Sequence, residues 1–353
     1  MFMGISPKGV DMVLRIVLCC IPLFAGTAFC CSSSLAQEFS SSRASQSSGF
    51  LHFGLMQAVE QFGVYSPIEN LSGKVCYRGS SSMSDVGQRL GSSFHKFHSQ
   101  VEFAGTTQGS ELALQSLAES PDLIIGISRP VNEDDLKLLQ AGKCKEPVAF
   151  VVATEAMAVY VNDKNPIVSL SKDDFVRLFA VTVDGKETVW GDFGVAGDLS
   201  GREIARFERG SDSGTQTFLV RTLLANAPPA ASFKVCSTNA EVCAEVGKNS
   251  HGVGIGDLYA GIPGTRRVPL VVDSRVVEAS EENVLNGSYP LVRPFILVFD
   301  KSQCVQDGGL RESVVRFVLS RDGQATVMKS GLFPVDPAFA NHQLAEVFGQ
   351  KVR

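Results

Sequence analysis

From Gly73 onward, short apolar runs alternate with amphipathic stretches of helical period. The runs "GKVCYRG", "DLIIGIS" and "RPFILVF" predict strands. The continuous apolar character of "DLIIGIS" is typical of a strand that is buried on both faces. Between the first two runs, apolar residues recur at helical spacing and predict a helix: Met83, Val86, Leu90, Phe94 and Phe97. This alternation predicts an α/β architecture with a mostly parallel sheet.

The remaining predicted elements continue the same alternation. Ser171 and Asp174 have capping-box spacing and mark the start of a helix before Phe175. Further strands are expected over residues 100–105, 146–161, 252–259 and 266–272. Further helices are expected around Leu112 to Leu117, after Thr215, and over 312–320 and 338–348.

The N-terminus has the layout of a secretory signal peptide. Two basic residues precede an apolar run over 16–29, which is too short to span a bilayer. Small residues before Gln37 supply a cleavage point, so residues 1–36 are predicted to be removed. Anchoring as a lipoprotein through Cys30 or Cys31 is disfavoured, because bulky Phe29 occupies a position that usually holds a small residue.

Residues 37–71 form a serine-rich leader followed by an extension containing a short apolar, helix-like segment. No later stretch is apolar enough for a membrane span. We therefore expect the mature protein to be periplasmic or secreted.

Five of the nine cysteines lie beyond the predicted signal peptide: Cys76, Cys144, Cys236, Cys243 and Cys304. None of them has C-x-x-C or Cys/His zinc spacing, so no metal site is predicted. Because an exported chain can hold disulfides, a bond between Cys236 and Cys243 is the favoured pairing. Unpaired thiols at both positions fit the sequence equally well.

The charge of the chain narrows the choice of partner. The formal net charge is −5, and there are no runs of Lys or Arg. Both features argue against nucleic acid as a partner. A small anion is still compatible, because a pocket can be locally positive in an acidic protein.

Three segments share one chemical layout: "YRGSSSMSDVG", "GTTQGSELAL" and "FERGSDSGTQTF". In each, a strand leads through Ser, Thr and Gly into a helix. The unpaired N–H groups and the positive dipole end of a helix N-terminus favour phosphate, sulfate or carboxylate. A single such loop is more often an ordinary cap or turn. Three of them, with Arg129 and Arg209 nearby, predict an oxyanion site at the carboxyl ends of the strands.

The third segment also invites comparison with a serine hydrolase. A nucleophile elbow requires Ser at the centre of G-x-S-x-G, where this chain has Asp212, and a Gly-Asp-Ser-Gly site fails at Ser211. None of the histidines lies in a catalytic motif, and His95 and His98 are expected on a solvent-facing helix surface. The Walker and H-E-x-x-H patterns are missing. We therefore predict that the protein is not an enzyme.

Several motifs, in order from about 72 to 335, resemble those of the exported phosphate-binding proteins (PstS-like) that serve ABC transporters. "GSSSM", "TTQGSELALQSL" and "DLIIGISRP" are similar to the first landmarks of that family. "RGSDSGT" matches its Arg-x-x-x-Ser-Gly-Thr signature, the most specific of the set. "GVGIGDLY" and "YPLVRPF" are similar to later landmarks.

This resemblance implies a type II periplasmic-binding-protein fold: two α/β lobes, each a mixed, mostly parallel sheet flanked by helices, closing around an anion. Lobe 1 would comprise residues 72–152 and 263–353, and lobe 2 residues 153–262. The resemblance also implies the phosphate-binding residues, with Ser82 as the alternative to Ser81: Ser80, Ser81, Gly109, Ser110, Ser128, Arg129, Arg209, Ser213, Gly214 and Thr215.

The implied function is capture of inorganic phosphate and its delivery to an ABC transporter permease, by a monomer without a cofactor. Some family members have an aspartate where this chain has Arg129, and that aspartate accepts the proton of the phosphate. Asp212 is then the candidate acceptor here, or a partner of Arg209. The alternatives are another tetrahedral oxyanion (sulfate, molybdate or arsenate) and a secreted PstS-like protein with a phosphatase or adhesion role.

Overall fold

The computed structural model describes residues 55–180, 188–211, 213–220, 224, 227–230 and 232–349. The predicted signal peptide, the whole serine-rich leader, the first residues of the extension and Asp212 lie outside these residues. In the described part of the chain, no helix combines the length and apolarity needed to cross a membrane.

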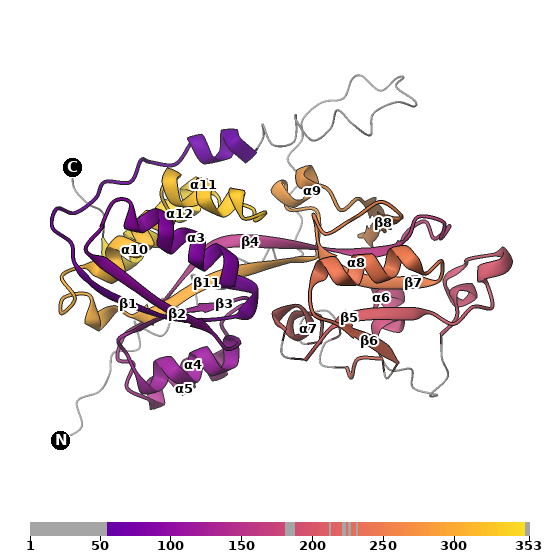
Figure 1. Ribbon diagram of the computed structural model, residues 1–353, viewed down its shortest axis with the longest axis horizontal. Coiled ribbons are helices and arrows are strands. Elements are labelled where there is room, and N and C mark those ends of the chain that lie inside the picture. Colours follow the sequence, from indigo (N-terminus) through magenta and orange to yellow (C-terminus); the bar gives the residue numbers. More distant parts are fainter. Residues whose placement is uncertain are drawn as a thin grey trace.

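The chain forms two α/β lobes that are joined by two long strands (Figure 1). The hydrogen-bonded order of the main sheet is β2-β1-β3-β11-β4-β7-β5-β6, and β8 pairs with β4. The elements of the first lobe are β1 (Gly73–Gly79), η1 (Ser81–Met83), α3 (Ser84–His95), β2 (Val101–Thr107), α4 (Ser110–Glu119), β3 (Leu123–Ile127), α5 (Glu133–Ala141), η5 (Lys301–Gln303), α10 (Leu310–Val318), α11 (Arg321–Lys329) and α12 (Pro337–Phe348).

The second lobe is built on the same principle, with strands that lead into helices. It also carries a separate two-stranded sheet formed by β9 and β10. Its elements are α6 (Lys172–Phe179), η2 (Trp190–Phe193), η3 (Gly197–Leu199), β5 (Ala205–Arg209), α7 (Gly214–Phe218), β6 (Phe233–Cys236), α8 (Asn239–Lys248), β7 (Gly252–Asp257), β8 (Thr265–Arg267), β9 (Leu270–Val272), β10 (Arg275–Val277) and α9 (Glu281–Leu285).

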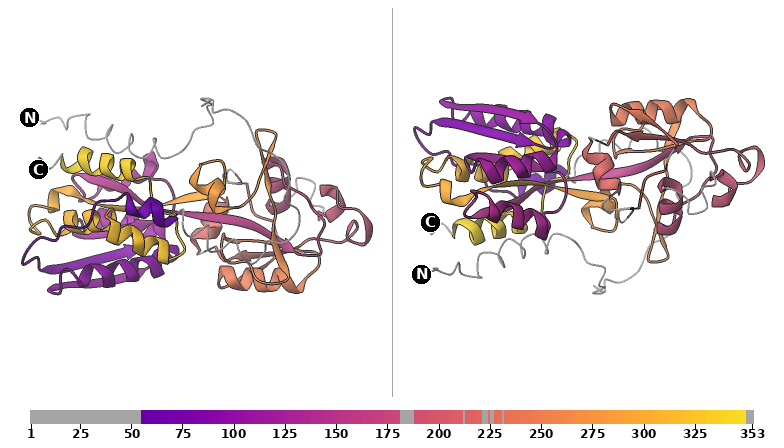
Figure 2. Two further views of the ribbon diagram at one scale, coloured as in Figure 1. Left: turned by 90° about the horizontal axis from the view of Figure 1, so that it is seen from above. Right: turned by 90° about the horizontal axis from the view of Figure 1, so that it is seen from below.

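The strands β4 (Pro147–Asn162) and β11 (Val292–Asp300) run from one lobe into the other, and the lobes stay side by side in both views of Figure 2. They pair antiparallel, with a register shift between Phe295 and Ile296. In the main sheet every antiparallel pair includes β4 or β11, whereas β1 pairs in parallel with β2 and β3, and β5 with β6 and β7. The sheet is mixed, as the sequence predicts.

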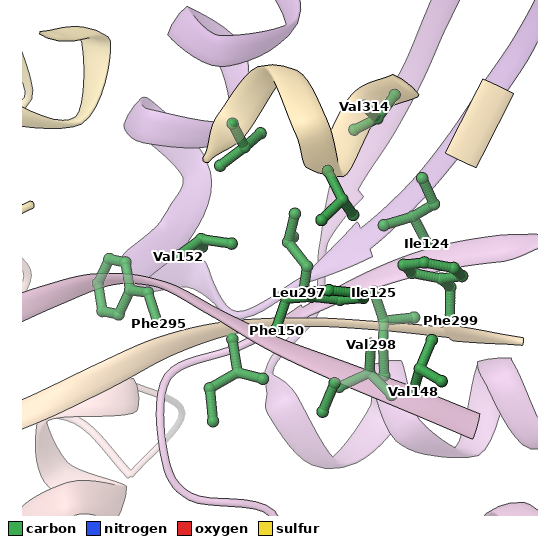
Figure 3. Packing of buried hydrophobic residues seen from close by; sticks show 14 of the residues in the cluster. Ile124, Ile125, Val148, Phe150, Val152, Phe295, Leu297, Val298, Phe299 and Val314 are labelled. Atoms are coloured by element: carbon green, nitrogen blue, oxygen red, sulfur yellow. The ribbon is translucent and has the colours of Figure 1, made fainter. Parts of the chain in front are cut away.

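Two clusters of buried apolar side chains stabilise the two lobes. In the first, Phe150 of β4 stacks on Phe299 of β11 with 5.8 Å between ring centroids, among the aliphatic residues that Figure 3 labels. Burying one such side chain contributes about 1.5–3 kcal/mol. In the second, Trp190 is fully buried and donates from Nε1 to the carbonyl of His251 at 3.0 Å.

The second cluster extends further along the chain than the predicted lobe 2. Buried residues between Val268 and Leu291 pack in it, although the resemblance implies that lobe 1 resumes at residue 263. The first cluster resumes at Phe295 on β11. We therefore propose that the chain returns to lobe 1 along β11.

The segment before β1 is attached to the first lobe. Residues 55–60 are helical, and the Gly63 carbonyl accepts from the backbone N–H of Arg321 at 2.8 Å. The Tyr65 hydroxyl lies 2.8 Å from His98 Nε2, and His98 is buried. The expectation that His98 faces solvent was wrong, because this segment covers it.

The cysteine region differs from the favoured prediction. All five described cysteines are free thiols, so the Cys236–Cys243 disulfide is not formed. Cys236 ends β6, whereas Cys243 lies on helix α8, which begins after the capping residue Thr238. Likewise, the predicted strand over 266–272 is two short strands, because Pro269 has no N–H to continue a ladder.

Candidate functional site

The first two predicted loops meet at one edge of the sheet in lobe 1. Ser80 follows β1 and Ser128 follows the parallel strand β3, so the two serines leave the sheet at the same edge. Their hydroxyl oxygens lie 2.8 Å apart and both side chains are buried. Ser110, at the start of α4, accepts a hydrogen bond from the backbone N–H of Ser128 at 3.3 Å.

Backbone hydrogen bonds hold these loops together. The Ser80 N–H donates to the Gly126 carbonyl at 2.8 Å, and the N–H of Gly109 donates to the Gly79 carbonyl at 3.2 Å. Gly109 has φ of 95°, a conformation that favours glycine, and it is the N-cap of α4. The hydroxyl cluster therefore stands on a fixed backbone.

The third loop brings lobe 2 against the same serines. Gly214 begins α7, and a methyl group added to it would lie 2.6 Å from Ser82 Oγ, 2.7 Å from Ser128 Oγ and 3.0 Å from Ser80 Oγ. Of Ser81 and Ser82, which the sequence does not distinguish, Ser81 is exposed. Ser82 is the one that faces the second lobe.

Ser213 and Thr215 of the third loop are also buried. Ser213 is the N-cap of α7, and its hydroxyl oxygen accepts from the Gln216 N–H at 3.1 Å, which leaves the hydroxyl hydrogen free to donate to a ligand. Thr215 is 4% exposed. His95, His98 and His342 contact other residues. Among the described residues, no histidine side chain contacts Ser213. Asp212 lies outside the described residues.

The two predicted arginines differ in their surroundings. Arg129 donates from Nε, Nη1 and Nη2 to Glu111, Asp135 and the Pro130 carbonyl, in five hydrogen bonds of 2.6–3.1 Å. These bonds account for all five N–H groups of its guanidinium. Arg209, at the end of β5, has a buried Nε without a hydrogen-bond partner. Arg209 is therefore the one of the two with a donor available for a ligand.

Arg293 on β11 is a further charged residue at this place, and the sequence analysis did not select it. It is fully buried, and its Nη2 donates to Ser82 Oγ at 3.1 Å and lies 3.5 Å from Thr215 Oγ1. Glu155, directly opposite on β4, forms an ion pair with it. An arginine at the start of the apolar strand run "RPFILVF" is the signal that could have identified it.

Burial changes the acidity of two carboxyl groups near this cluster. Burial raises the pKa of Glu155, whereas Arg293 and more weakly Arg209 act to lower it. Burial also raises the pKa of Glu208 to about 7, although a hydrogen bond from Gln216 acts to lower it. Within the described ranges, no cluster of His, Cys, Asp and Glu could hold a metal ion.

Together these residues form a buried, donor-rich site between the lobes. Hydroxyl groups come from both lobes, and two arginine side chains have buried nitrogens without partners, Arg209 Nε and Arg293 Nη1. Hydrogen-bond donors with fixed positive charge suit a dehydrated oxyanion. The arrangement has the chemistry needed to bind such an anion.

Known proteins with similar sequences include phosphate-binding proteins. Residues 69–322 match the PBP superfamily domain. The phosphate-binding protein PstS of Pseudomonas aeruginosa is 25% identical over 289 residues, covering 80% of this chain and 90% of that protein. PstS of Staphylococcus epidermidis is 24% identical over 266 residues, covering 73% and 78%.

Solved structures show the same fold. An ABC-type phosphate transport receptor from Vibrio cholerae superposes with a TM-score of 0.63 at 18% identity, covering 74% of this chain and all of that one. A possible phosphate-binding protein from Planctomyces limnophilus gives a TM-score of 0.63 at 19% identity, covering 79% of this chain and all of that one. The two-lobed type II architecture predicted from the sequence is confirmed.

Proposed function

The chain belongs to the PBP superfamily, and from this premise we propose that it is a solute-binding protein that captures inorganic phosphate between its lobes. It delivers the phosphate to the permease of an ABC transporter. This proposal rests on one observation: the hydroxyl groups of Ser80, Ser82 and Ser128 converge on Gly214 at the boundary of the lobes. The named relatives, which are phosphate-binding proteins, support the choice of anion.

The proposed cycle needs no covalent step. Donors from both lobes bond the anion only when the lobes are together, so the ligand shifts the population toward the closed form. Hydroxyl groups and arginine N–H groups replace the water that the anion loses. We propose that the protein acts as an exported monomer without enzymatic activity, after removal of the signal peptide.

Isothermal titration calorimetry of the mature protein with phosphate and with sulfate tests this proposal. We expect phosphate to bind with micromolar or tighter affinity and sulfate to bind at least tenfold more weakly. Equal affinities would favour a general oxyanion receptor, and no phosphate binding would refute the proposal. Trp190 is a poor reporter of closure, because it is fully buried within the core of one lobe.

A further inference from the structure

We propose that Arg293 binds the anion through its unpartnered Nη1, and that Glu155 attenuates its charge while the site is empty. The inference rests on the proposed function of the site. It adds an arginine from the strand that joins the lobes to the binding residues that the sequence indicates. It also gives a role to a carboxylate that the loop motifs do not include.

The guanidinium of Arg293 lies close to hydroxyl groups of both lobes. Its backbone lies on β11, opposite Glu155 on β4, where these strands pass between the lobes. Its Nη2 reaches Ser82 of the first lobe at 3.1 Å and lies 3.5 Å from Thr215 of the second. An anion among these hydroxyls would therefore meet a cation fixed to the connecting strands.

The guanidinium has donors to spare on one edge. Glu155 bonds to Nε and Nη2, which leaves Nη1 buried and without a hydrogen-bond partner. Nη1 shares the terminal edge of the planar fork with Nη2, whose two hydrogens are directed to Glu155 and Ser82, so Nη1 is the donor that an oxygen of the anion would meet. Because Nη2 already contacts Ser82, this edge is directed toward the hydroxyl cluster.

The surroundings strengthen the interaction with an anion. Arg293 has no exposed surface, and the rings of Phe218 and Phe295 lie 5.8 and 5.7 Å from its guanidinium carbon. A buried charge interacts more strongly with an opposite charge than an exposed one does, because water screens it less. It also requires a counter-charge when no ligand is bound, which Glu155 supplies.

The first test replaces the pair together, so that no buried charge is left unpaired. We expect the double variant Arg293→Gln/Glu155→Gln to fold and to bind phosphate at least about 30-fold more weakly than the wild type, as for loss of a buried charged contact. Arg293→Lys keeps the charge but loses the fork, and about a tenfold loss is expected. Calorimetry measures affinity, and circular dichroism and thermal melting confirm folding.

Arg311→Lys is the matched control. Arg311 is a second buried arginine with a carboxylate partner, Asp307, but it contacts Asp122 before β3, at the end of that strand opposite to Ser128. Its variant should melt at a lower temperature and bind phosphate like the wild type. Unchanged affinity in both Arg293 variants, with wild-type binding intact, would overturn the role of Arg293 alone. Failure of the wild type to bind phosphate would instead overturn the proposed function, and this inference with it.

Glu155→Gln should change phosphate affinity in the direction opposite to the Arg293 variants. The amide oxygen can still accept from Arg293, but the negative charge near the anion is gone. We expect phosphate to bind roughly threefold to tenfold more tightly, because less repulsion opposes it. A residue that only supports the fold would give unchanged or weaker binding, and either result would overturn the role assigned to Glu155.

Discussion

Arg129 and Asp135 form a two-bond ion pair in the interior of the first lobe, with Nη1 and Nη2 lying 2.6 and 2.9 Å from the two carboxylate oxygens. Both side chains are less than 10% exposed. Asp135 also completes the capping box of α5 with Asn132. The arginine that motif matching places in the phosphate site is thus bound to carboxylates of its own lobe.

We therefore expect Arg129→Met to act mainly on stability. Removing one partner of a buried pair leaves Asp135 unpaired and should lower the free energy of unfolding by about 3–5 kcal/mol. Phosphate affinity of the folded protein should stay within about threefold of the wild type. Urea unfolding and calorimetry measure the two quantities.

The exposed pair of Arg89 and Asp85, 2.7 Å apart, is the control for this substitution. Arg89→Met should change stability by less than about 1 kcal/mol, since water screens a surface pair. Loss of phosphate binding in Arg129→Met, with stability retained, would contradict this interpretation and return Arg129 to the site.

Substitution of Arg209 should change phosphate affinity more than stability, in contrast to substitution of Arg129. Its Nε is buried and has no partner, so its removal leaves few protein contacts broken. We expect Arg209→Ala to weaken phosphate binding by about 2–5 kcal/mol, as for a desolvated partner of an anion. Calorimetry of this variant and of Arg275→Ala, which removes an exposed arginine of the same lobe, measures the difference. Equal affinities in the two variants would exclude Arg209 from the site.

Gly214 is expected to matter through its lack of a side chain. In Gly214→Ala the new methyl group would lie within 3.0 Å of three serine hydroxyls, so the lobes could not approach to the same distance. Stability should not fall, because Ala is the better helix former, whereas phosphate affinity should fall at least about tenfold. The control is Gly201→Ala, whose added methyl meets only open space. Wild-type affinity in Gly214→Ala would show that close approach at this point is not required.

The loops of the site could be predicted because local sequence determines them. A strand, a hydroxyl-rich turn and a helix follow each other within a few residues, and parallel strands bring such turns to one edge of the sheet. Ser80 and Ser128 therefore meet as the sequence indicates. The sequence "GSSSM" did not show which serine faces the second lobe. That Ser82 does so, and not Ser81, depends on where η1 begins.

The charges of the site could not be predicted in the same way. Arg293 and Glu155 are separated by 138 positions and meet only because β11 and β4 pair across the molecule. The motif places Arg129 among the phosphate-binding residues, but its guanidinium forms an ion pair with Asp135, six positions later. Helix α8 is also not among the elements predicted from the sequence, although Thr238 and Glu241 have capping spacing and Val242 and Val246 recur at helical spacing.

The buried carboxyl of Glu208 predicts how stability depends on pH. Burial raises its pKa from 4.5 to about 7 in the folded protein, so the folded state holds a proton that the unfolded state has already released between those values. Its contribution to stability is fully present below about pH 4.5 and is lost as the pH rises through about 7. The total loss is on the order of 3 kcal/mol.

Glu208→Gln removes this titration while its side-chain oxygen can still accept from Gln216 Nε2, which lies 3.0 Å from the carboxylate in the wild type. We expect the free energy of unfolding of the variant, relative to the wild type, to rise between pH 4.5 and 8 by up to about 3 kcal/mol. Urea unfolding in phosphate-free buffer across this range measures it, because bound anion would stabilise the folded state separately. Parallel pH profiles for the two proteins would mean that Glu208 stays ionised in the fold, with Arg206 and Gln216 compensating for its burial.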